Sequence, residues 1–472
     1  MTPQHVQSAR LPLRVRRFVR CRPVCGTFTA LLLLILLLVL ANCNQPTSKR
    51  DQVSLTMIDQ GWFDKEIREA RDLELRQFTQ ETGIRVEVLP APESAVEQIV
   101  LWKKLLANAR SSPDVLGIDV IWPALLADDL LDLKPYLTSS EISAVFPELA
   151  AIYTVNGKLV ALPYRVGAGL LFYRTDLLQQ YGYRSPPKTW HQLEQMAARI
   201  QTGERAKGNK EFWGFVWQGS PSEALTCDAL EWQASEGGGK IIEDNGVITV
   251  KNRNTVRAWR RAARWVGSIS PPSVVSYKEW DSFNIWRSGN AAFMRNWPAG
   301  YAVSQASGSA VRDRFGITAL PRGKSGRAAT LGSDGFAISR RSPHPREAVL
   351  LVRFLCRRDL QLRRALAKFD PPAIPDLYTD PELKKAVSYF PHVQQENLYG
   401  IVTRPATLAG TNYLAISQAY FTAVHSVLTG QKPPEKAVDE LQQQLMRITG
   451  MPEGPPNLEK RGLERQGRGR FR

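Results

Sequence analysis

The stretch VSLTMI at residues 53–58, with IRVEVL at 84–89 and DVLGID at 114–119, decides the fold class of this chain. Each segment is short and rich in β-branched residues, which is typical of strands, and the segments between them have helical periodicity. A β–α–β–α–β order predicts parallel strands covered by helices on both faces. Ligands of such sheets bind beyond the carboxyl ends of the strands. Asp119, which ends the third strand, is therefore a candidate ligand-binding residue.

The same α/β pattern continues along the chain, which at 472 residues is too long for one ordinary core and is expected to form two lobes. Further strands are predicted at residues 159–163, 169–173, 213–217, 290–294 and within 328–340. Later helices are predicted at 345–366, 413–428 and 434–449.

The first 43 residues have the features of an export signal. An Arg-rich stretch precedes an apolar run from Phe28 to Ala41, which is short for a membrane span and suits a signal peptide. The run ends in Leu-Ala-Asn-Cys, which resembles a bacterial lipoprotein signal with Cys43 as the lipidated residue, and a polar linker follows at 44–51. Asn42 departs from the small residue of that pattern. A signal without lipidation stays open as the alternative.

The net charge of +17 lies mostly at the two ends of the chain. Residues 1–22 contribute +6 and residues 459–472 contribute +4, which leaves +7 for the long middle part. Basic and aromatic residues do not interleave there, so nucleic acid is not an expected partner. Residues 453–472 are rich in Pro, Gly and Arg and are expected to form a disordered basic tail, which could bind an anionic lipid or polymer.

The cysteines and histidines show no metal-ligand spacing, and no metal or cofactor is expected. Only Cys227 and Cys356 remain for the mature fold; two buried thiols are expected, with a disulfide as the alternative. The chain contains no nucleophile elbow, zinc-protease or P-loop motif, and no carboxylate pair marks a glycosidase. An enzyme is therefore not expected.

Several stretches in order carry a resemblance to the family-1 extracellular solute-binding proteins of ABC transporters, nearest the trehalose/maltose-binding group. These stretches span about residues 53–450 and are Asp114–Pro123, Gly157–Trp190, Trp213–Gly239, Gly289–Pro298, Ala329–Ser339 and Gly400–Gly430.

The resemblance implies a type II periplasmic-binding-protein fold, in which two α/β lobes joined by crossing hinge segments close over a ligand. Its expected boundaries put lobe 1 at residues 52–162 and 300–356, and lobe 2 at residues 163–299 and 357–452. The implied partners are a small ligand such as a sugar, and the permease and ATPase subunits of the transporter. A monomer in the periplasm or at the cell surface is expected.

Carried over residue by residue, the resemblance gives Asp119 as an acceptor of sugar hydroxyls, Trp297 as a stacking aromatic and Arg404 as a cleft arginine. The chain departs from the disaccharide binders at four positions, which are Arg165, Gly167, Ala299 and Asp334. Either these positions have drifted at the rim, or the specificity has changed. In the second hypothesis Arg165 and Asp334 form a new polar pair or recognise a charged ligand, since arginine suits planar anions.

Two tryptophans complete the candidate ligand residues. Trp217 ends a predicted strand, and it is expected either in the core or in the pocket. Trp62 follows the first strand in a loop that is expected at the edge of the cleft. Asp228 and Glu231, three residues apart on a helix, are expected on a solvated face. The function expected is the capture of a mono- or disaccharide; the alternatives are a charged or modified sugar, a sensory accessory with the same fold and, less favoured, a glycosidase.

Overall fold

Two sheets organise the part of the chain that the structure describes. The computed structural model describes residues 53–59, 65–92, 95–108, 112–367, 370–387 and 400–456, all of which belong to one unit that begins at Val53. Trp62, Cys43 and most of the predicted tail lie outside the described residues.

The larger sheet has six strands, with the order β12-β11-β3-β1-β2 and with β6 on the other edge of β11. The predicted parallel pairing is confirmed, because β1 pairs in parallel with both β2 and β3. Its strands are β1 (Ser54–Ile58), β2 (Arg85–Leu89), β3 (Val115–Asp119), β6 (Leu162–Ala168), β11 (Ala329–Ile338) and β12 (Ile401–Val402).

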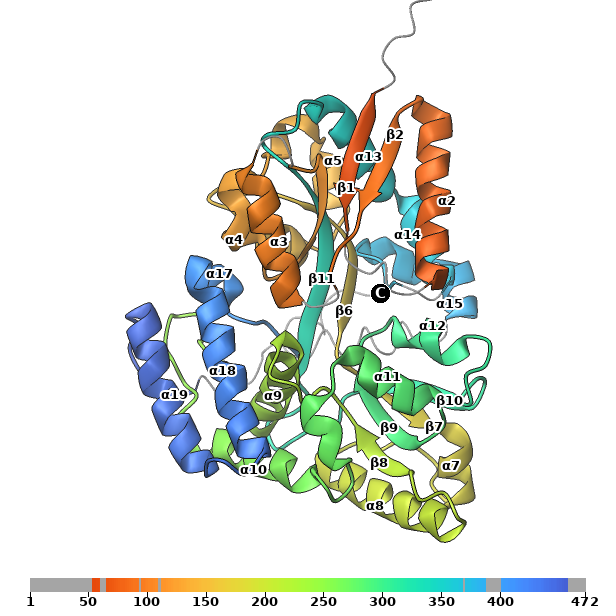
Figure 1. Cartoon of the computed structure of the whole chain (residues 1–472), viewed down its shortest axis with the longest axis vertical. Helices are drawn as coiled ribbons and strands as arrows, with labels where there is room; N and C mark the ends of the chain where they lie inside the picture. Colours follow the sequence, from red (N-terminus) through yellow and green to blue (C-terminus); the bar gives the residue numbers. More distant parts are fainter. Residues whose placement is uncertain are drawn as a thin grey trace, which may run out of the picture. The chain divides into compact units, whose positions relative to one another are not determined.

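Strand β11 is the long strand at the centre of this sheet (Figure 1). Its second half pairs with β3, its first two residues pair with β12, and its other edge pairs with β6. Residues separated by more than 160 positions in the sequence therefore become neighbours, such as Asp334 and Arg165. The candidate ligand residues lie along this strand.

The smaller sheet has four strands in the order β10-β7-β9-β8. These are β7 (Leu170–Arg174), β8 (Trp213–Val216), β9 (Ala291–Asn296) and β10 (Phe315–Ala319). Only Gly169 separates β6 from β7, so the chain passes from one sheet to the other at that glycine. A Cβ at Gly169 would lie 2.1 Å from Oε1 of Glu231, which explains why no side chain fits there.

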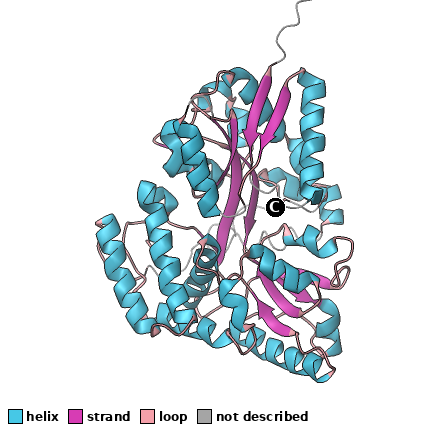
Figure 2. Ribbon diagram, viewed as in Figure 1, coloured by secondary structure: helices cyan, strands magenta, loops and turns pink. Residues whose placement is uncertain are grey.

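Helices cover the sheets, as Figure 2 shows in cyan. The helices beside the larger sheet include α2 (Lys65–Thr82), α3 (Ala95–Ala107), α4 (Pro123–Leu126), α5 (Ser139–Ser143), α6 (Pro147–Ile152), α13 (Pro345–Leu355), α14 (Arg358–Leu366) and α15 (Pro381–Ala386). The helices that lie between β7 and β10 in the chain are α7 (Thr175–Gln180), α8 (Trp190–Ala206), α9 (Glu223–Glu236), α10 (Arg253–Trp265), α11 (Glu279–Arg287) and α12 (Gly300–Gln305). The last helices are α17 (Ala406–Ala409), α18 (Tyr413–Leu428) and α19 (Pro434–Thr449).

The predicted lobe boundaries differ from the observed packing in three segments. Residues 163–168 belong to β6 and pair with β11, although they were expected in lobe 2. Strand β10 pairs with β7 in the smaller sheet, although residues 300–356 were expected in lobe 1. Arg364 of α14 forms an ion pair of 2.7 Å with Glu74 of α2, which ties residues 358–366 to the larger sheet. Pairing and ion contacts at long sequence separation decide these boundaries, and a single sequence does not display them.

Two smaller predictions can also be compared with the structure. Cys227 and Cys356 are buried free thiols, as expected. The tail begins later than residue 453, because Glu453 forms a β-bridge with Ile248 and Gly454 donates to the Ile248 carbonyl at 3.1 Å. Within the described ranges, every helix is too short or too polar to cross a membrane.

Candidate functional site

Four consecutive residues of β11, from Leu331 to Asp334, lie beside four of the side chains predicted for ligand binding, and Asp334 is itself a fifth. Asp334 lies directly opposite Asp119 of β3 on one side and opposite Arg165 of β6 on the other. Because residues in register on neighbouring strands share one face of the sheet, these three side chains form a row, called here the β11 row. Arg404 and Trp297 reach the strand at Leu331 and Gly332.

Arg165 holds one end of the β11 row through two carboxylates. It forms an ion pair and hydrogen bond with Asp334, and its Nη1 donates to Oδ1 of Asp370 at 2.8 Å. The predicted polar pair of Arg165 and Asp334 is thus confirmed. Asp334 is only 5% exposed, and burial raises its pKa although Arg165 acts to lower it. Asp334 is therefore not a solvated rim charge, whereas the side chain of Arg165 is 28% exposed.

Asp119 lies at the carboxyl end of β3, where the parallel pattern predicts a ligand residue. Its Oδ1 accepts from the Ile121 backbone N–H at 3.0 Å and lies 3.5 Å from Nη2 of Arg404. Burial raises the pKa of Asp119 to about 6, and the neighbouring carboxylate of Asp334 adds to the rise while Arg404 opposes it. A carboxylate so placed is a strong acceptor for the hydroxyl groups of a ligand.

Arg404 links β3, β11 and helix α9 at the other end of the row. Its Nη2 donates to the Leu331 carbonyl at 3.1 Å, and its Nη1 donates to Oε1 of Glu223 at 2.9 Å. Glu223 is itself held by hydroxyl groups of α18, since Ser417 donates to its Oε2 at 2.6 Å and Tyr413 donates to its Oε1. The guanidinium is therefore fixed before any ligand arrives.

Trp297 follows β9 and rests against β11. A Cβ at Gly332 would lie 3.1 Å from Cζ3 of the indole, so the glycine lets the ring approach the strand. The next residue, Pro298, lies against Gly167, where a Cβ would be 3.1 Å from its Cγ. A side chain at Gly167 would press on Pro298, which would have to shift by a few tenths of an ångström.

A buried ionic cluster contacts the indole ring of Trp297 through Arg295. The guanidinium carbon of Arg295 lies 4.3 Å from the centre of the indole ring, in the geometry of a cation–π contact. Arg295 forms ion pairs of 2.8 Å with Asp228 and 2.5 Å with Glu231, and its Nη1 donates to Gln218 at 3.1 Å. Together Arg295, Asp228, Glu231 and Gln218 are called the Arg295 cluster.

The Arg295 cluster corrects the expectation that Asp228 and Glu231 lie on a solvated face. Both carboxylates are fully buried, because α9 is enclosed by α10, α18 and β11. Burial raises the pKa of Asp228, against the lowering effect of Arg295. Glu231 also accepts from the Thr330 backbone N–H of β11 at 3.1 Å. These groups are structural and hold β11 rather than ligand.

Trp217 is a core residue, which corrects its place among the ligand candidates. It is fully buried, its ring packs edge-to-face on Trp232 at 5.0 Å, and its Nε1 donates to Ser270 at 3.0 Å. No surface of its ring is left for a ligand. Trp62 lies outside the described residues and stays a prediction.

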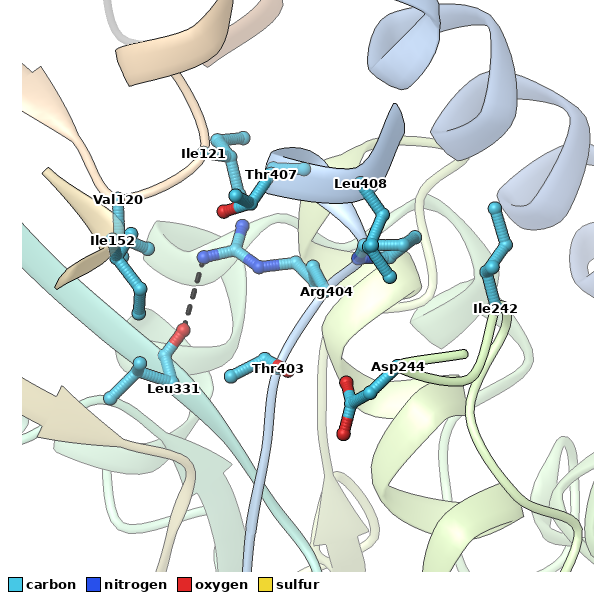
Figure 3. Close-up of a pocket in the computed structure, with 12 residues that line it drawn as sticks. Val120, Ile121, Ile152, Ile242, Asp244, Leu331, Thr403, Arg404, Thr407 and Leu408 are labelled. Atoms are coloured by element: carbon cyan, nitrogen blue, oxygen red, sulfur yellow. Dashed lines mark hydrogen bonds between the residues drawn. The ribbon is translucent and has the colours of Figure 1, made fainter. Parts of the chain in front are cut away.

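A cavity of about 250 Å³ lies beside Arg404 and Leu331, and its lining does not include Asp119, Asp334, Arg165 or Trp297. Figure 3 shows Arg404 extending toward Val120 and Ile121, with its hydrogen bond to Leu331, while Ile242 and Asp244 come from the other side. The other lining residues are Ile152, Thr403, Pro405, Ala406, Thr407 and Leu408. The walls are thus mostly aliphatic, with polar groups from Arg404, Asp244 and the threonines, which is typical of small-molecule sites.

The described residues contain no group of three or more His, Cys, Asp or Glu side chains placed to hold a metal ion. What the β11 row and its neighbours offer is a set of fixed acceptors and donors beside one indole ring. This arrangement can bind the hydroxyl groups and apolar face of a small polar molecule. Sequence reasoning missed Glu223, Arg295 and Asp370; their partners lie more than 60 residues away, so no local pattern could indicate them.

The titration of Asp119 gives a measurable prediction. Its pKa of about 6 exceeds that of an unfolded aspartate, about 3.9, so the folded chain retains a proton that the unfolded chain has released. The contribution of Asp119 to the free energy of unfolding should therefore fall by about 2 kcal/mol as the pH rises from 4 to 7. Denaturant titrations of the wild type and an Asp119→Asn variant across this range test it. The difference between the two should grow with pH; a constant difference would show that Asp119 titrates normally.

Comparisons with known proteins agree with this architecture. A family model described as bacterial extracellular solute-binding protein matches residues 75–391. A protein of Deinococcus radiodurans described as "Probable ABC transporter-binding protein" is 43% identical over 378 residues, 79% of this chain and 89% of that protein. Maltose-bound T. maritima MalE3 has 34% sequence identity and a TM-score of 0.78, over 84% of this chain and 100% of that one.

A solute-binding protein of Thermotoga lettingae bound with α-D-tagatose shares the fold at 21% identity and a TM-score of 0.76, over 84% of this chain and 100% of that one. The predicted α/β periplasmic-binding-protein fold is thereby confirmed, and the family is one of binding proteins rather than enzymes. The chain belongs to the bacterial extracellular solute-binding proteins of ABC transporters.

Proposed function

We propose that this protein captures a sugar or polyol of monosaccharide size for an ABC importer. The observation that carries the proposal is the convergence of Asp119, Asp334, Arg404 and Trp297 on residues 331–334 of β11. Carboxylates and guanidiniums hydrogen-bond to hydroxyl groups, and an indole stacks on the apolar face of a sugar ring. That MalE3, at 34% identity, is a maltose-bound structure supports a carbohydrate ligand.

The size of the ligand is limited by the side chains of Arg165 and Asp334, which occupy part of the site. The ion-paired side chains of Arg165 and Asp334 stand at two of the positions where this chain departs from the disaccharide binders, and neither offers a ring on which a second sugar unit could stack. A monosaccharide or a linear polyol therefore fits better than a disaccharide.

The proposed mechanism of capture is closure of two lobes about the segments that pass between the two sheets. One of these segments is β6 with Gly169, and the other is β11. The Arg295 cluster contacts β11 where Glu231 accepts a hydrogen bond from the Thr330 backbone N–H. Arg404 contacts Asp119 of the larger sheet and Glu223 of α9 at the same time. A ligand seated beside Arg404 would contact both groups and would favour the closed arrangement.

Thermal unfolding in the presence of single sugars tests the function. A ligand at a hundredfold excess over its Kd stabilises the protein by about 2.7 kcal/mol, which raises Tm by several degrees. We expect such a rise with at least one monosaccharide or polyol and a smaller rise with maltose. If no sugar or polyol at millimolar concentration raises Tm, the proposal is wrong.

We also propose export and attachment to the membrane through a lipid on Cys43, which lies outside the described residues. The family supports an extracellular or periplasmic location, and the attachment rests on the signal pattern alone. A Cys43→Ser variant is expected to move from the membrane fraction to the soluble fraction of cells. A variant that stays with the membrane would contradict the anchor.

A further inference from the structure

The charges around the β11 row are predominantly negative. Each of the two guanidiniums of the site is already placed between two carboxylates, so four carboxylates share two positive charges. The contacts are those of Arg165 with Asp334 and Asp370, and of Arg404 with Asp119 and Glu223. An anionic ligand, the kind that a free Arg165 would favour, meets an excess of like charge here.

Two of the carboxylates, those of Asp119 and Asp334, lie opposite each other on neighbouring strands. Asp119 and Asp334 are direct cross-strand partners in the antiparallel pair of β3 and β11, and like charges at such positions are destabilising. Arg165 approaches Asp334 at Oδ2, and Arg404 approaches Asp119 from the opposite end of the row. Arg404 acts on both carboxylates, but burial and their mutual repulsion still raise the pKa of Asp119.

The side chain of Asp334 is 8% exposed, and its oxygen Oδ1 is buried. This oxygen has no hydrogen-bond partner among the described residues. An unsatisfied buried acceptor costs roughly 1–3 kcal/mol, and more when the group is charged. Within a fixed site of a binding protein, such an oxygen indicates the place of a ligand donor. A neutral hydroxyl would satisfy the oxygen but would leave the repulsion between Asp119 and Asp334 unchanged.

From this geometry we infer that the ligand presents an ammonium group to Asp119 and Asp334, which makes amino sugars or amino polyols the preferred substrate class. The ammonium donates to Oδ1 of Asp334 and to the facing carboxylate of Asp119, and it offsets one of their two charges. The inference rests on the proposed function, because it assigns the ligand of the same site.

The other groups around the pair are consistent with a cation. The hydroxyl of Tyr153 approaches Ser333 at 3.4 Å, and burial raises the pKa of this tyrosine, so it stays neutral. The burial of the carboxylate pair raises the pKa of Asp119 to about 6, and a bound cation would lower it again. Binding should therefore weaken as the pH falls from 7 to 5, where the pair takes up a proton.

Calorimetric titration at pH 7 with matched hexoses tests the inference. The probes are glucose, glucosamine and glucuronate, and the same series on galactose and mannose, so that only the charge of one substituent changes. A primary amine with a pKa close to that of a peptide α-amino group, about 7.7–8.0, is mostly charged at this pH. We expect one amino sugar to bind at least about tenfold tighter than its neutral counterpart, because charge-assisted hydrogen bonds are about twice as strong as neutral ones, and the acid to bind weakest.

Asp334→Asn and Asp119→Asn variants provide the decisive comparison, and both are checked by thermal unfolding to be folded. In either variant the preference for the amino sugar should fall at least tenfold, whereas Asp313→Asn, an exposed aspartate in an ion pair with Arg312 at 3.7 Å, should retain it. Equal or tighter binding of the neutral sugars to the wild type, or an undiminished preference in both variants, would overturn the inference and leave the proposed function standing. Failure of all sugars to bind would instead contradict the proposed function.

Discussion

Replacing Arg295 with methionine is expected to lower the free energy of unfolding by about 3–5 kcal/mol, since removal of one partner of a buried ion pair leaves an uncompensated buried charge. Arg295 is fully buried and forms ion pairs with both Asp228 and Glu231. The methionine keeps most of the volume, so the loss measures the charge rather than a cavity. Urea denaturation monitored by circular dichroism gives the free energy.

Two further variants separate this effect from a general loss of arginine. Arg260→Met removes an arginine that is 47% exposed and paired with Glu435, and it should change the free energy of unfolding by less than about 1 kcal/mol. Adding Asp228→Asn and Glu231→Gln to Arg295→Met removes the uncompensated charges and should restore part of the stability. A single Arg295→Met variant as stable as Arg260→Met would show that the cluster does not hold this part of the fold.

Replacing Trp297 with alanine should weaken sugar binding by about 2 kcal/mol, or about thirtyfold in Kd, because it removes the aromatic ring of the site. The ring is held between Arg295 and Gly332, so its orientation is fixed before binding. Titration calorimetry with the sugar that stabilises the protein most gives the Kd.

Trp213→Ala is a matched control for this substitution. Trp213 is half-buried at the start of β8 and lies under Arg205, with 4.1 Å between the guanidinium carbon and the ring centre. Its loss should leave the Kd within about twofold of the wild type, since it lies outside the β11 row. If Trp297→Ala binds as tightly as Trp213→Ala, the indole of Trp297 is not part of the binding site.

The larger sheet could be predicted from sequence because its signals are local. The three strands that end at Ile58, Leu89 and Asp119 alternate with helices, and this order alone places Asp119 at the carboxyl end of a parallel strand. The convergence of Asp119 with Asp334 and Arg165 depends on β11 lying between β3 and β6. That register joins residues 169 and 215 positions apart, and one sequence carries no local sign of it.

The expectations that proved wrong concern residues whose surroundings are set at long range. Asp228 and Glu231 look like a polar helix face, but α9 is covered on all sides and their partner Arg295 lies 64 or more residues away. Trp217 looks like a residue at a strand end, but Trp232 and Trp265, from two separate helices, pack against it and against each other and bury it. Hydrophobic pattern predicts burial well only where a single face of an element is covered.

A crystal structure of the protein with its tightest-binding sugar tests the central claim most directly. The account predicts one ordered ligand that contacts the carboxylates of Asp119 and Asp334, lies beside the indole of Trp297 and is within hydrogen-bonding distance of Arg404. A ligand bound elsewhere on the molecule, with these four side chains untouched, would contradict it.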